Sequence, residues 1–369
     1  YLSEYNKTSL KQKSCYIAYT DENVHESLRT GLDKSPLYDG TIQSIGPRYC
    51  PSIETKLVTF PDKNRHQLFL EPEGETTAEY YLNGFSSSLP LDVQLKSLRK
   101  IKGFDKAKIF RPGYAIEYDF FHPTQLKNSL ETKLVENLYF AGQINGTTGY
   151  EEAGAQGIMA GINAHLKLNG RPEFILTRDQ AYIGVLIDDL ITKGVDEPYR
   201  MFTSRAEFRI LLRQDNADIR LTELSHQMGL ASSERFEIMK YKIKQRDALI
   251  DFFKSYSCVP KHINTKLEEL GTSPLKQKIK LINIISRPQV GINDILDTIT
   301  ALKDFIDNIP NRREEIIDIS EILMKYSGYI DREKEMAGKL QRLENIEIYE
   351  KIDYSKIQSL SNEGREKLL

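Results

Sequence analysis

The sequence predicts an α/β domain followed by an all-α domain, and three observations support this fold class. A short apolar run at residues 138–141 leads through a glycine-containing turn into an alanine- and glycine-rich helix that begins near Glu151. Between Gly46 and Asn169, short β-like runs are separated by clusters of Pro, Gly and Asn. Beyond Leu221, glycine becomes sparse, charge rises and helical patterns dominate.

The length and composition are those of an ordinary globular protein of two or three domains. The chain has 369 residues, 40% of them hydrophobic and 28% charged, with a formal net charge of −2. The charge balance predicts no global basic field, so any nucleic-acid binding must come from a local patch. No membrane span is expected, because Asp188 and Asp189 interrupt the most apolar stretch and a span needs about 20 apolar residues.

The cysteines and histidines favour a reducing compartment and no metal. Cys15, Cys50 and Cys258 are too few and too scattered for a disulfide framework or a zinc cluster. The six histidines form no metal-ligand pattern. The sequence starts at Tyr1 without Met or a signal segment and contains no G-x-G triplet, so we expect a piece of a longer polypeptide.

The elements of the first part follow from side-chain alternation and turn chemistry. Alternation predicts a first strand at residues 14–19, and a polar start with an apolar period predicts a helix at 23–32. A later helix is expected at residues 179–193. Further short strands are expected at residues 57–60, 66–70, 108–110, 115–120 and 138–140.

The second part reads as a series of amphipathic helices. Ser232 and Ser233 can cap a helix whose apolar residues recur at helical spacing as far as Phe253. Further amphipathic helices are expected at residues 292–309 and 320–345.

Glycines mark the junction near residue 142 as a candidate ligand site. The turn carries Gly142 and Gly146, and glycine lets backbone N–H groups approach a ligand at the positive end of a helix. Spacings of three and four leave one face of the following helix almost without side chains. A neighbouring strand or a flat cofactor would pack against that face, which carries Gly154, Gly157 and Gly161.

The stretch from Gly46 to Lys56 contains a candidate nucleophile. Cys50 lies near Arg48 in a turn-like context, and a nearby guanidinium favours the thiolate that a reactive cysteine needs. The alternative is a plain buried cysteine. In the same stretch, Glu54 and Lys56 are suited to an ordinary surface ion pair.

Two polar loops follow. Glu71 and Glu73 share one face if the strand continues, although Pro72 indicates that the strand ends here. The two carboxylates can divide acid and base roles, or simply form a solvated turn. The loop at residues 83–90 places three serines beside an Asn-Gly turn, where they can bind a flavin edge or a substrate, or satisfy their own backbone.

An arginine run is the best candidate for a polyanion site. Arg205, Arg209 and Arg213 are spaced by four, so they share a face in either a helix or a strand, and Arg200 is near. Guanidinium groups suit phosphates, whereas acidic neighbours make a structural salt-bridge network the alternative. Tyr199 and Phe202 are close enough in the chain to stack a base.

Five motifs carry a resemblance to a known family. They read Gly-Pro-Arg-Tyr-Cys-Pro-Ser-Ile-Glu, Gln-Leu-Phe-Leu-Glu-Pro-Glu-Gly, Arg-Pro-Gly-Tyr-Ala-Ile-Glu-Tyr-Asp, Phe-Ala-Gly-Gln-Ile-Asn-Gly-Thr-Thr-Gly-Tyr-Glu-Glu-Ala and Tyr-Arg-Met-Phe-Thr-Ser-Arg-Ala-Glu. They stand at residues 46–54, 67–74, 111–119, 140–153 and 199–207. In this order they resemble the MnmG family, also called GidA, of flavin-dependent tRNA wobble-uridine modification enzymes.

The resemblance implies a fold, an activity and partners. The fold is a partial glutathione-reductase-like FAD-binding α/β domain followed by an all-α domain. The activity adds an aminomethyl or carboxymethylaminomethyl group at C5 of the tRNA wobble uridine, using FAD, NADH and a folate one-carbon unit. The expected partners are tRNA, the GTPase MnmE and a second copy in a homodimer, in the cytoplasm and away from membranes. The implied domains are the end of an inserted NAD-binding-like domain (1–45), the C-terminal half of the FAD-binding domain (46–220) and a helical domain for tRNA and the GTPase (221–369).

The resemblance also implies roles for individual residues. Cys50 matches the proposed catalytic thiol of the family, which fits the chemistry, because a nucleophile that adds at C6 of uridine makes C5 nucleophilic. Gln143 matches the residue that contacts FAD, within the turn of Gly142 and Gly146. The arginines that would hold tRNA are Arg200, Arg205, Arg209 and Arg213. The segment that matches the nicotinamide-dinucleotide site comprises Gly46, Pro47, Arg48, Tyr49, Cys50, Pro51, Ser52, Ile53, Glu54, Thr55, Lys56, Leu57, Val58, Thr59 and Phe60.

Some family features are absent from the sequence. The N-terminal glycine fingerprint that cradles the FAD pyrophosphate is missing, as is the second family cysteine near it, so this chain alone is expected to bind FAD poorly and to be inactive. The alternative function is a non-catalytic scaffold that binds tRNA or a partner. A third candidate, the related folate/FAD tRNA methyltransferases, is disfavoured by the long helical extension after Leu221.

Overall fold

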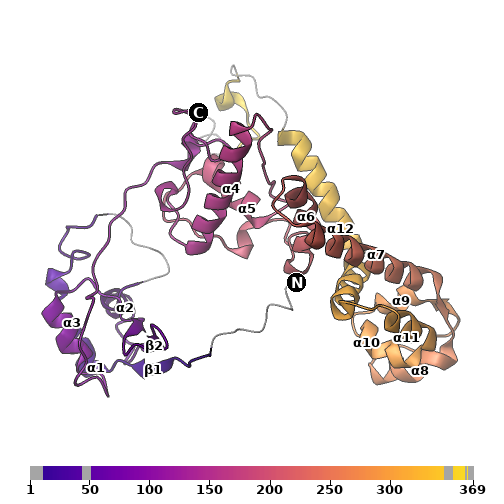
Figure 1. Ribbon diagram of the computed structural model, residues 1–369, viewed down its shortest axis with the longest axis horizontal. Helices are drawn as coiled ribbons and strands as arrows, with labels where there is room; N and C mark the ends of the chain where they lie inside the picture. Colours follow the sequence, from indigo (N-terminus) through magenta and orange to yellow (C-terminus); the bar gives the residue numbers. More distant parts are fainter. Residues whose placement is uncertain (1–10, 44–50, 345–351, 362–363, 365–369) are drawn as a thin grey trace. The chain divides into compact units, whose positions relative to one another are not determined.

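A computed structural model describes residues 11–43, 51–344, 352–361 and 364 of the chain (Figure 1). The chain divides into two compact units, residues 2–206 and residues 207–369, the second with Tyr1. The first unit combines strands and helices and the second is almost entirely helical, which confirms the predicted fold class. The expected divisions at residues 45 and 220 stay predictions.

The first unit begins with a three-stranded antiparallel sheet in the order β1-β2-β3. The strands are β1 (Tyr16–Tyr19), β2 (Gln67–Pro72) and β3 (Tyr80–Asn83). Ala18 pairs with Leu68, and Leu70 pairs with Leu82. These four residues share one face because side chains alternate along a strand. The fully buried Leu68 anchors that face in a hydrophobic core. The strands predicted at residues 14–19 and 66–70 are therefore confirmed.

Three helices complete this core: α1 (Glu22–Arg29), α2 (Ile53–Thr59) and α3 (Leu91–Leu98). The side chain of Asp21 caps α1 by accepting a hydrogen bond from Val24 N at 3.0 Å, and the helix predicted at residues 23–32 is confirmed. Ser52 caps α2 in the same way, accepting from Thr55 N at 3.2 Å. The strand predicted at residues 57–60 is therefore wrong, because this segment continues the helix that Ser52 starts.

The rest of the first unit contains α4 (Tyr150–Leu168) and α5 (Tyr182–Asp188), the latter continuing as a π-helical turn at Asp189–Lys193. Both predicted helices are confirmed. The strands predicted at 108–110 and 115–120 are wrong, since the structure gives these residues no strand, and residues 138–140 make only an isolated bridge at Tyr139. Short 3-10 turns connect the segments, at Leu32–Lys34, Pro123–Gln125, Gln143–Asn145 and Thr203–Arg205.

The second unit is built around two long helices, α7 (Ser233–Ser255) and α12 (Arg313–Glu344). Ser232 caps α7 by accepting a hydrogen bond from Arg235 N, which confirms the predicted start. The amphipathic stretch at 292–309 is divided into short pieces, and α12 begins before the predicted residue 320. The other elements are Gln214–Asn216, α6 (Ala217–Gln227), β4 (Ser257–Cys258), α8 (Pro260–Glu269), β5 (Ile279–Lys280), α9 (Leu281–Ile285), α10 (Ile292–Ile295), Leu296–Thr298, α11 (Thr300–Asp307) and Tyr354–Lys356.

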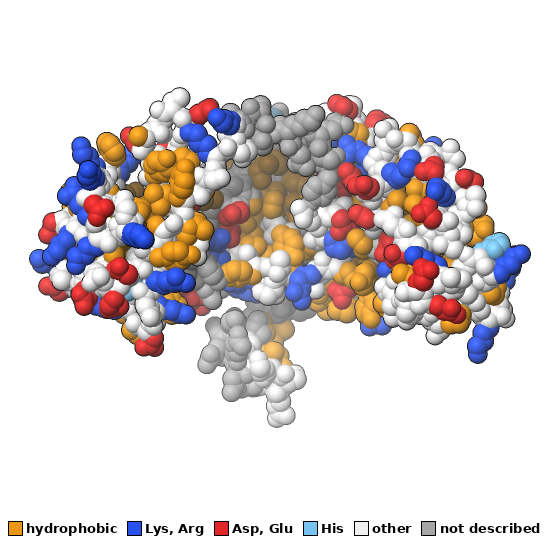
Figure 2. All heavy atoms as spheres, turned by 90° about the horizontal axis from the view of Figure 1, so that it is seen from below, with side chains coloured by type: hydrophobic (Ala, Val, Ile, Leu, Met, Phe, Trp, Pro, Cys, Tyr) orange, Lys and Arg blue, Asp and Glu red, His pale blue; other side chains and the backbone are white. Residues whose placement is uncertain are grey.

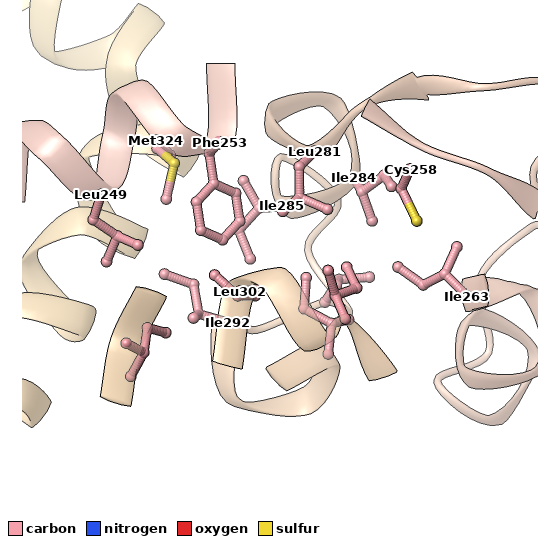
Figure 3. Close-up of a cluster of buried hydrophobic side chains, with 14 of the residues drawn as sticks. Leu249, Phe253, Cys258, Ile263, Leu281, Ile284, Ile285, Ile292, Leu302 and Met324 are labelled. Carbon is pink, nitrogen blue, oxygen red and sulfur yellow. The ribbon is translucent and has the colours of Figure 1, made fainter. Parts of the chain in front are cut away.

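The core of the second unit gathers side chains from many short helices around α7. Phe253 and Leu249 of α7 are fully buried and lie beside Leu281 and Ile285 of α9, and Leu302 of α11 faces them (Figure 3). A charged group is also buried here. Lys242 of α7 is 2% exposed, and its ammonium lies 2.6 Å from Asp218 of α6 and 3.1 Å from Glu315 of α12.

Candidate functional site

The first half of the Cys50 motif, Gly46–Cys50, lies outside the described residues. The second half forms the start of α2 and its N-cap Ser52. The catalytic role of Cys50, two residues before the cap in the sequence, therefore stays a prediction.

Glu54 connects this motif to the serine loop. Its side chain is fully buried, and Oε1 accepts hydrogen bonds from Ser88 N at 2.7 Å and Ser88 Oγ at 2.6 Å. Ser88 Oγ also lies 2.6 Å from Ser35 Oγ. Lys56 donates from Nζ to the carbonyl oxygen of Gly84 at 3.0 Å. The surface ion pair suggested for Glu54 is therefore wrong, and the serine loop holds α2 in place.

Glu71 and Glu73 make hydrogen bonds within the hairpin of β2 and β3. Glu71 accepts a hydrogen bond from Asn83 Nδ2 at 3.0 Å, on the neighbouring strand β3. Glu73 donates from its backbone N–H to the carbonyl oxygen of Glu79 at 3.1 Å. This geometry favours the solvated turn over a pair of acid and base carboxylates.

The turn before α4 has a backbone conformation that favours glycine at two positions. Gly142 and Gly146 bracket the 3-10 turn with φ angles of 87° and 73°. Other residues are strained at positive φ. A Cβ on Gly146 would also lie 2.6 Å from Val195 Cγ2. Glycine is therefore favoured at both ends of the turn, and the half-buried Gln143 lies at its start.

Gln156 of α4 holds the turn from behind. It is fully buried, and its Oε1 accepts from Gly142 N at 3.1 Å and from Asn145 Nδ2 at 2.7 Å. Its Nε2 donates to Thr147 Oγ1 at 2.9 Å, and that hydroxyl donates to the carbonyl oxygen of Gly142 at 2.9 Å. Asn145 Oδ1 is buried without a hydrogen-bond partner. The turn is preorganised by its own helix and retains one unsatisfied acceptor.

The N-terminus of α4 carries a buried carboxylate. Glu152 is 3% exposed, and its Oε1 accepts from Arg200 Nε at 3.1 Å and from Met201 N at 2.7 Å. A Cβ on Gly149 would lie 1.8 Å from Glu152 Oε2, so glycine keeps this space for the carboxylate. The helix end therefore holds a negative charge of its own, which the helix dipole stabilises.

The glycine face of α4 is open within the described part of the chain. At Gly154, Gly157 and Gly161, no atom other than the helix backbone lies within 4 Å of where a Cβ would stand. Ile158 on the same side of the helix is 56% exposed. Neither a strand nor any other described segment packs against this face.

The arginine run is divided between the two units and has no single regular conformation. Arg205 ends a 3-10 turn in the first unit, and Arg209 and Arg213 belong to the second. Four-residue spacing therefore does not give them a common face. Arg205 lies 4.2 Å from the Tyr199 ring centroid, and Arg213 pairs with Asp215 at 3.0 Å, whereas Arg209 is exposed.

One buried carboxylate, that of Asp189, connects this run to the glycine turn through Tyr199. Asp189 accepts hydrogen bonds from Arg178 Nη1 at 2.8 Å, Lys193 Nζ at 2.6 Å and the Tyr199 hydroxyl at 2.8 Å. Burial opposes ionisation of Asp189, but these donors outweigh it and lower its pKa. Tyr199 also donates from its backbone N–H to the carbonyl oxygen of Gly146 at 2.8 Å.

Three further observations concern the surface charge, groups that could hold a metal, and helices that could cross a membrane. On the face drawn in Figure 2, Lys and Arg side chains are interspersed with Asp and Glu and do not gather in one basic patch. In the part of the chain that the structure describes, no group of three or more His, Cys, Asp or Glu side chains is placed to hold a metal ion. None of the described helices combines the length and the apolar character that crossing a membrane requires.

Sequence reasoning missed Glu152, Gln156, Asn145 and Asp189 as organising residues. Polar residues in an otherwise small and apolar helix, directly after a Gly-Thr-Thr-Gly turn, were the available signal for the first two. Their function depends on the chain folding back onto the helix, which periodicity alone does not reveal.

Comparison with known proteins identifies matching families for both units. Residues 2–172 match the family model "Glucose inhibited division protein A", and residues 233–334 match "tRNA modifying enzyme MnmG/GidA C-terminal helical domain". Among curated proteins, the chain is similar to the tRNA uridine 5-carboxymethylaminomethyl modification enzymes MnmG of Parabacteroides distasonis (63% identity over 97% of the chain) and Bacteroides thetaiotaomicron (60% over 98%). The chain spans 58% of the length of each of these relatives.

Solved structures of Aquifex aeolicus GidA are similar in fold. The form I crystal structure superposes with a TM-score of 0.74 at 43% identity, and the form II structure with 0.73 at 41%. Each comparison covers 98% of the chain, and 56% and 55% of the respective GidA chains.

Proposed function

Because the chain belongs to the MnmG/GidA family, we propose that it is part of an enzyme that modifies C5 of the wobble uridine of tRNA. The observation that carries this proposal is the agreement of both family models, in chain order, with identities of 56–63% over nearly the whole chain. The product is an aminomethyl or a carboxymethylaminomethyl group, with a folate unit as the one-carbon source and an MnmE-type GTPase as partner. The whole enzyme is a cytoplasmic homodimer in this proposal.

FAD is the cofactor in this proposal, and the residues of the glycine turn fit a flavin. The pyrimidine edge of a flavin offers one N–H donor and carbonyl acceptors. The turn offers the unsatisfied Asn145 Oδ1, the half-buried amide of Gln143 and main chain freed of side chains at Gly142 and Gly146. These residues would hold the flavin, which supplies hydride and electron transfer when bound. The open glycine face of α4 supports close approach of further structure on this side.

The Gly46–Phe60 segment is proposed to bind NADH, and Cys50 within it to be the nucleophile. A Cys50 thiolate that adds at C6 of the uracil ring makes C5 nucleophilic, so that C5 can accept the one-carbon unit. The clamp between Glu54 and Ser88 supports this assignment, because it fixes the helix that starts two residues after Cys50.

Arginines are proposed to bind the tRNA backbone. Arg209 is exposed, so its guanidinium is available for a phosphate. Arg200, Arg205 and Arg213 have protein partners and would contribute less per residue.

Two measurements on the full-length protein test this function. A visible absorption spectrum with flavin bands is expected, and its absence would exclude the flavoprotein assignment. Nucleoside mass spectrometry of tRNA should detect C5-modified uridine with the wild type and none with Cys50→Ser, provided that the variant has the same thermal unfolding midpoint. Full modification by Cys50→Ser would contradict the nucleophile assignment, and tRNA binding without any modification would favour the scaffold alternative.

A further inference from the structure

The loop at residues 199–205 is fixed to the glycine turn at its first residue. Tyr199 donates its backbone N–H to the carbonyl oxygen of Gly146 at 2.8 Å, and an isolated parallel bridge joins Tyr199 to Thr147. Tyr199 is 4% exposed and packs in a small core with Val195. Its ring is therefore part of the interior and does not stack a base, a function that its place in the sequence allows.

The last residue of the 199–205 loop is held by Arg178. This guanidinium donates from Nη2 to the carbonyl oxygen of Arg205 at 3.1 Å, and from Nη1 to Asp189 Oδ1 at 2.8 Å. The Arg205 side chain returns to the start of the loop, where its Nε donates to the carbonyl oxygen of Arg200 at 2.8 Å. Its guanidinium carbon also lies 4.2 Å from the centre of the Tyr199 ring. The loop is therefore closed on itself and joined to Asp189 at its end.

The carboxylate of Asp189 connects both ends of this loop. Its side chain is 2% exposed, and Oδ2 accepts from the Tyr199 hydroxyl at 2.8 Å while Oδ1 accepts from Arg178. Asp189 begins the π-helical turn, a rare conformation that often occurs at functional sites. Buried ion pairs add little net stability compared with apolar side chains, but their hydrogen bonds have defined directions. The arrangement therefore determines where the loop lies more than it stabilises the unit.

The exposed part of the 199–205 loop suits a nucleic-acid backbone. Thr203 and Ser204 are exposed, and hydroxyl groups are common ligands of phosphate oxygens. Arg205 is half-buried and already has protein partners, so it would add little to the affinity for tRNA. The loop is therefore suited to setting the place of a bound tRNA, and less to setting the strength of binding.

We propose that Asp189 is a positioning residue for the tRNA substrate. Through the Arg178 guanidinium and the Tyr199 hydroxyl it fixes the 199–205 loop on the glycine turn, so that a tRNA in contact with the loop presents its uracil at the flavin. The inference rests on the proposed function, in which this turn holds the flavin. Misplacing reacting groups by about 1 Å can lower a rate about 100-fold. Loosening the loop should therefore slow the modification and leave the affinity for tRNA unchanged.

The first test is Arg178→Lys in the full-length, flavin-loaded protein with its partner GTPase. Lysine keeps the positive charge beside Asp189 but lacks the planar fork that also reaches the carbonyl oxygen of Arg205. We expect kcat for the modification of tRNA to fall at least about tenfold, with an unchanged KM for tRNA.

The matched control is Lys193→Met. Lys193 donates to the same Asp189 oxygen at 2.6 Å, but its side chain is 60% exposed. In the part of the chain that the structure describes, its hydrogen bond to Asp189 does not extend to the 199–205 loop. Both kcat and KM should therefore keep their wild-type values in this variant.

A second readout is independent of turnover. Transfer RNA is added without NADH or the one-carbon donor, and the visible absorption band of the bound flavin is recorded. In the wild type the band should shift when the uracil arrives beside the flavin. In Arg178→Lys, filter binding should give the wild-type dissociation constant for tRNA, whereas the shift should be lost. A merely structural role of Asp189 would instead change the flavin band in the absence of tRNA.

Tyr199→Phe is the second variant and decides alone if Arg178→Lys does not fold, as judged by the thermal unfolding midpoint. It removes the hydroxyl that Asp189 accepts from, and it keeps both the ring beside Arg205 and the backbone N–H. A wild-type kcat in a folded variant, or a flavin shift that the variant retains or the wild type lacks, would overturn the proposal. A rise in KM alone would also overturn it. A wild-type protein without a flavin band or without modified uridine would instead remove the proposed function on which the inference rests.

Discussion

Lys242 of α7 donates from its ammonium to the carboxylate of Asp218 on α6 at 2.6 Å, although its side chain is only 2% exposed. Glu315 of α12 lies at 3.1 Å from the same ammonium. A single buried cation thus joins three helices of the second unit. The two carboxylates are 21% and 20% exposed, so part of their charge reaches solvent.

Replacing Lys242 tests how much its two ion pairs contribute to the free energy of unfolding. Lys242→Met removes the cation and leaves two carboxylates facing each other, so we expect a loss of about 3 kcal/mol in the free energy of unfolding. Lys240→Met is the matched control two residues earlier in α7, because the side chain of Lys240 is 54% exposed in its ion pair with Glu237. The control should change stability by less than about 1 kcal/mol. Urea unfolding followed by circular dichroism measures both, and equal effects would contradict the role of burial.

Two glycines at the start of α4 should respond in opposite directions to alanine. In Gly149→Ala the new Cβ falls 1.8 Å from Glu152 Oε2, and we expect about 1–3 kcal/mol of destabilisation from displacement of that carboxylate. In Gly154→Ala the Cβ enters open space, and the better helix propensity should stabilise the chain by up to about 1 kcal/mol. Thermal unfolding of the two variants side by side checks the prediction, which a loss of stability in Gly154→Ala would refute.

The buried His25 and the half-buried His66 predict a loss of stability in mild acid. The rings of His25 and His66 have centroids 5.3 Å apart. Burial lowers the pKa of both below the usual 6.5, and for His25 the nearby Glu22 opposes this only in part. Below about pH 6.5 the unfolded chain binds protons that the folded chain does not, so stability is complete above this pH and falls as the pH decreases.

The measurement is the midpoint of thermal unfolding between about pH 8 and pH 5. His66→Leu should flatten this dependence, because one of the two imidazoles that resist protonation is gone. His262→Leu is the control at an exposed position and should keep the wild-type dependence. A wild-type midpoint that rises toward pH 5 would show the sign to be wrong.

Arg209 and Arg213 should contribute differently to the salt dependence of tRNA binding. Arg209→Gln removes an exposed guanidinium, so the slope of log affinity against log salt should fall by about 1. Arg213 is already paired with Asp215 and with the carbonyl oxygen of Ile210, so Arg213→Gln should change the slope less. Filter binding of tRNA to the full-length protein over a salt series measures both slopes. Equal slopes for the two variants would argue against a phosphate contact by Arg209.

Local signals in the sequence predicted the elements that depend on local chemistry. Ser232 marked the start of α7 correctly because a cap acts on the next turn of the same chain. Alternation at residues 16–19 and 67–70 predicted paired strands correctly because one face of each is buried. Residues 57–60 were assigned wrongly because their β-branched and aromatic side chains favour strands, whereas the Ser52 cap and burial of Leu57 favour α2.

The site was predicted less completely because its organisation is non-local. The glycine turn was found from its residues, but the function of Gln156 depends on its amide reaching back to Gly142, fourteen residues earlier. The common face expected for Arg205 and Arg209 assumed a regular element, and the chain has a 3-10 turn there instead. Contacts of this kind follow from the folded path of the chain, which side-chain periodicity does not encode.

The shared cation at Lys242 has a consequence for how the second unit opens. Each of α6, α7 and α12 contributes one charged group to this ion cluster. If one helix separates from the other two, at least one ion pair is broken and the charges that remain lose a partner. Separate fraying of these helices near the junction is therefore disfavoured, and they should open together as one cooperative segment. Amide protons of the three helices around Asp218, Lys242 and Glu315 would then exchange with deuterium at a common rate, set by a single opening event.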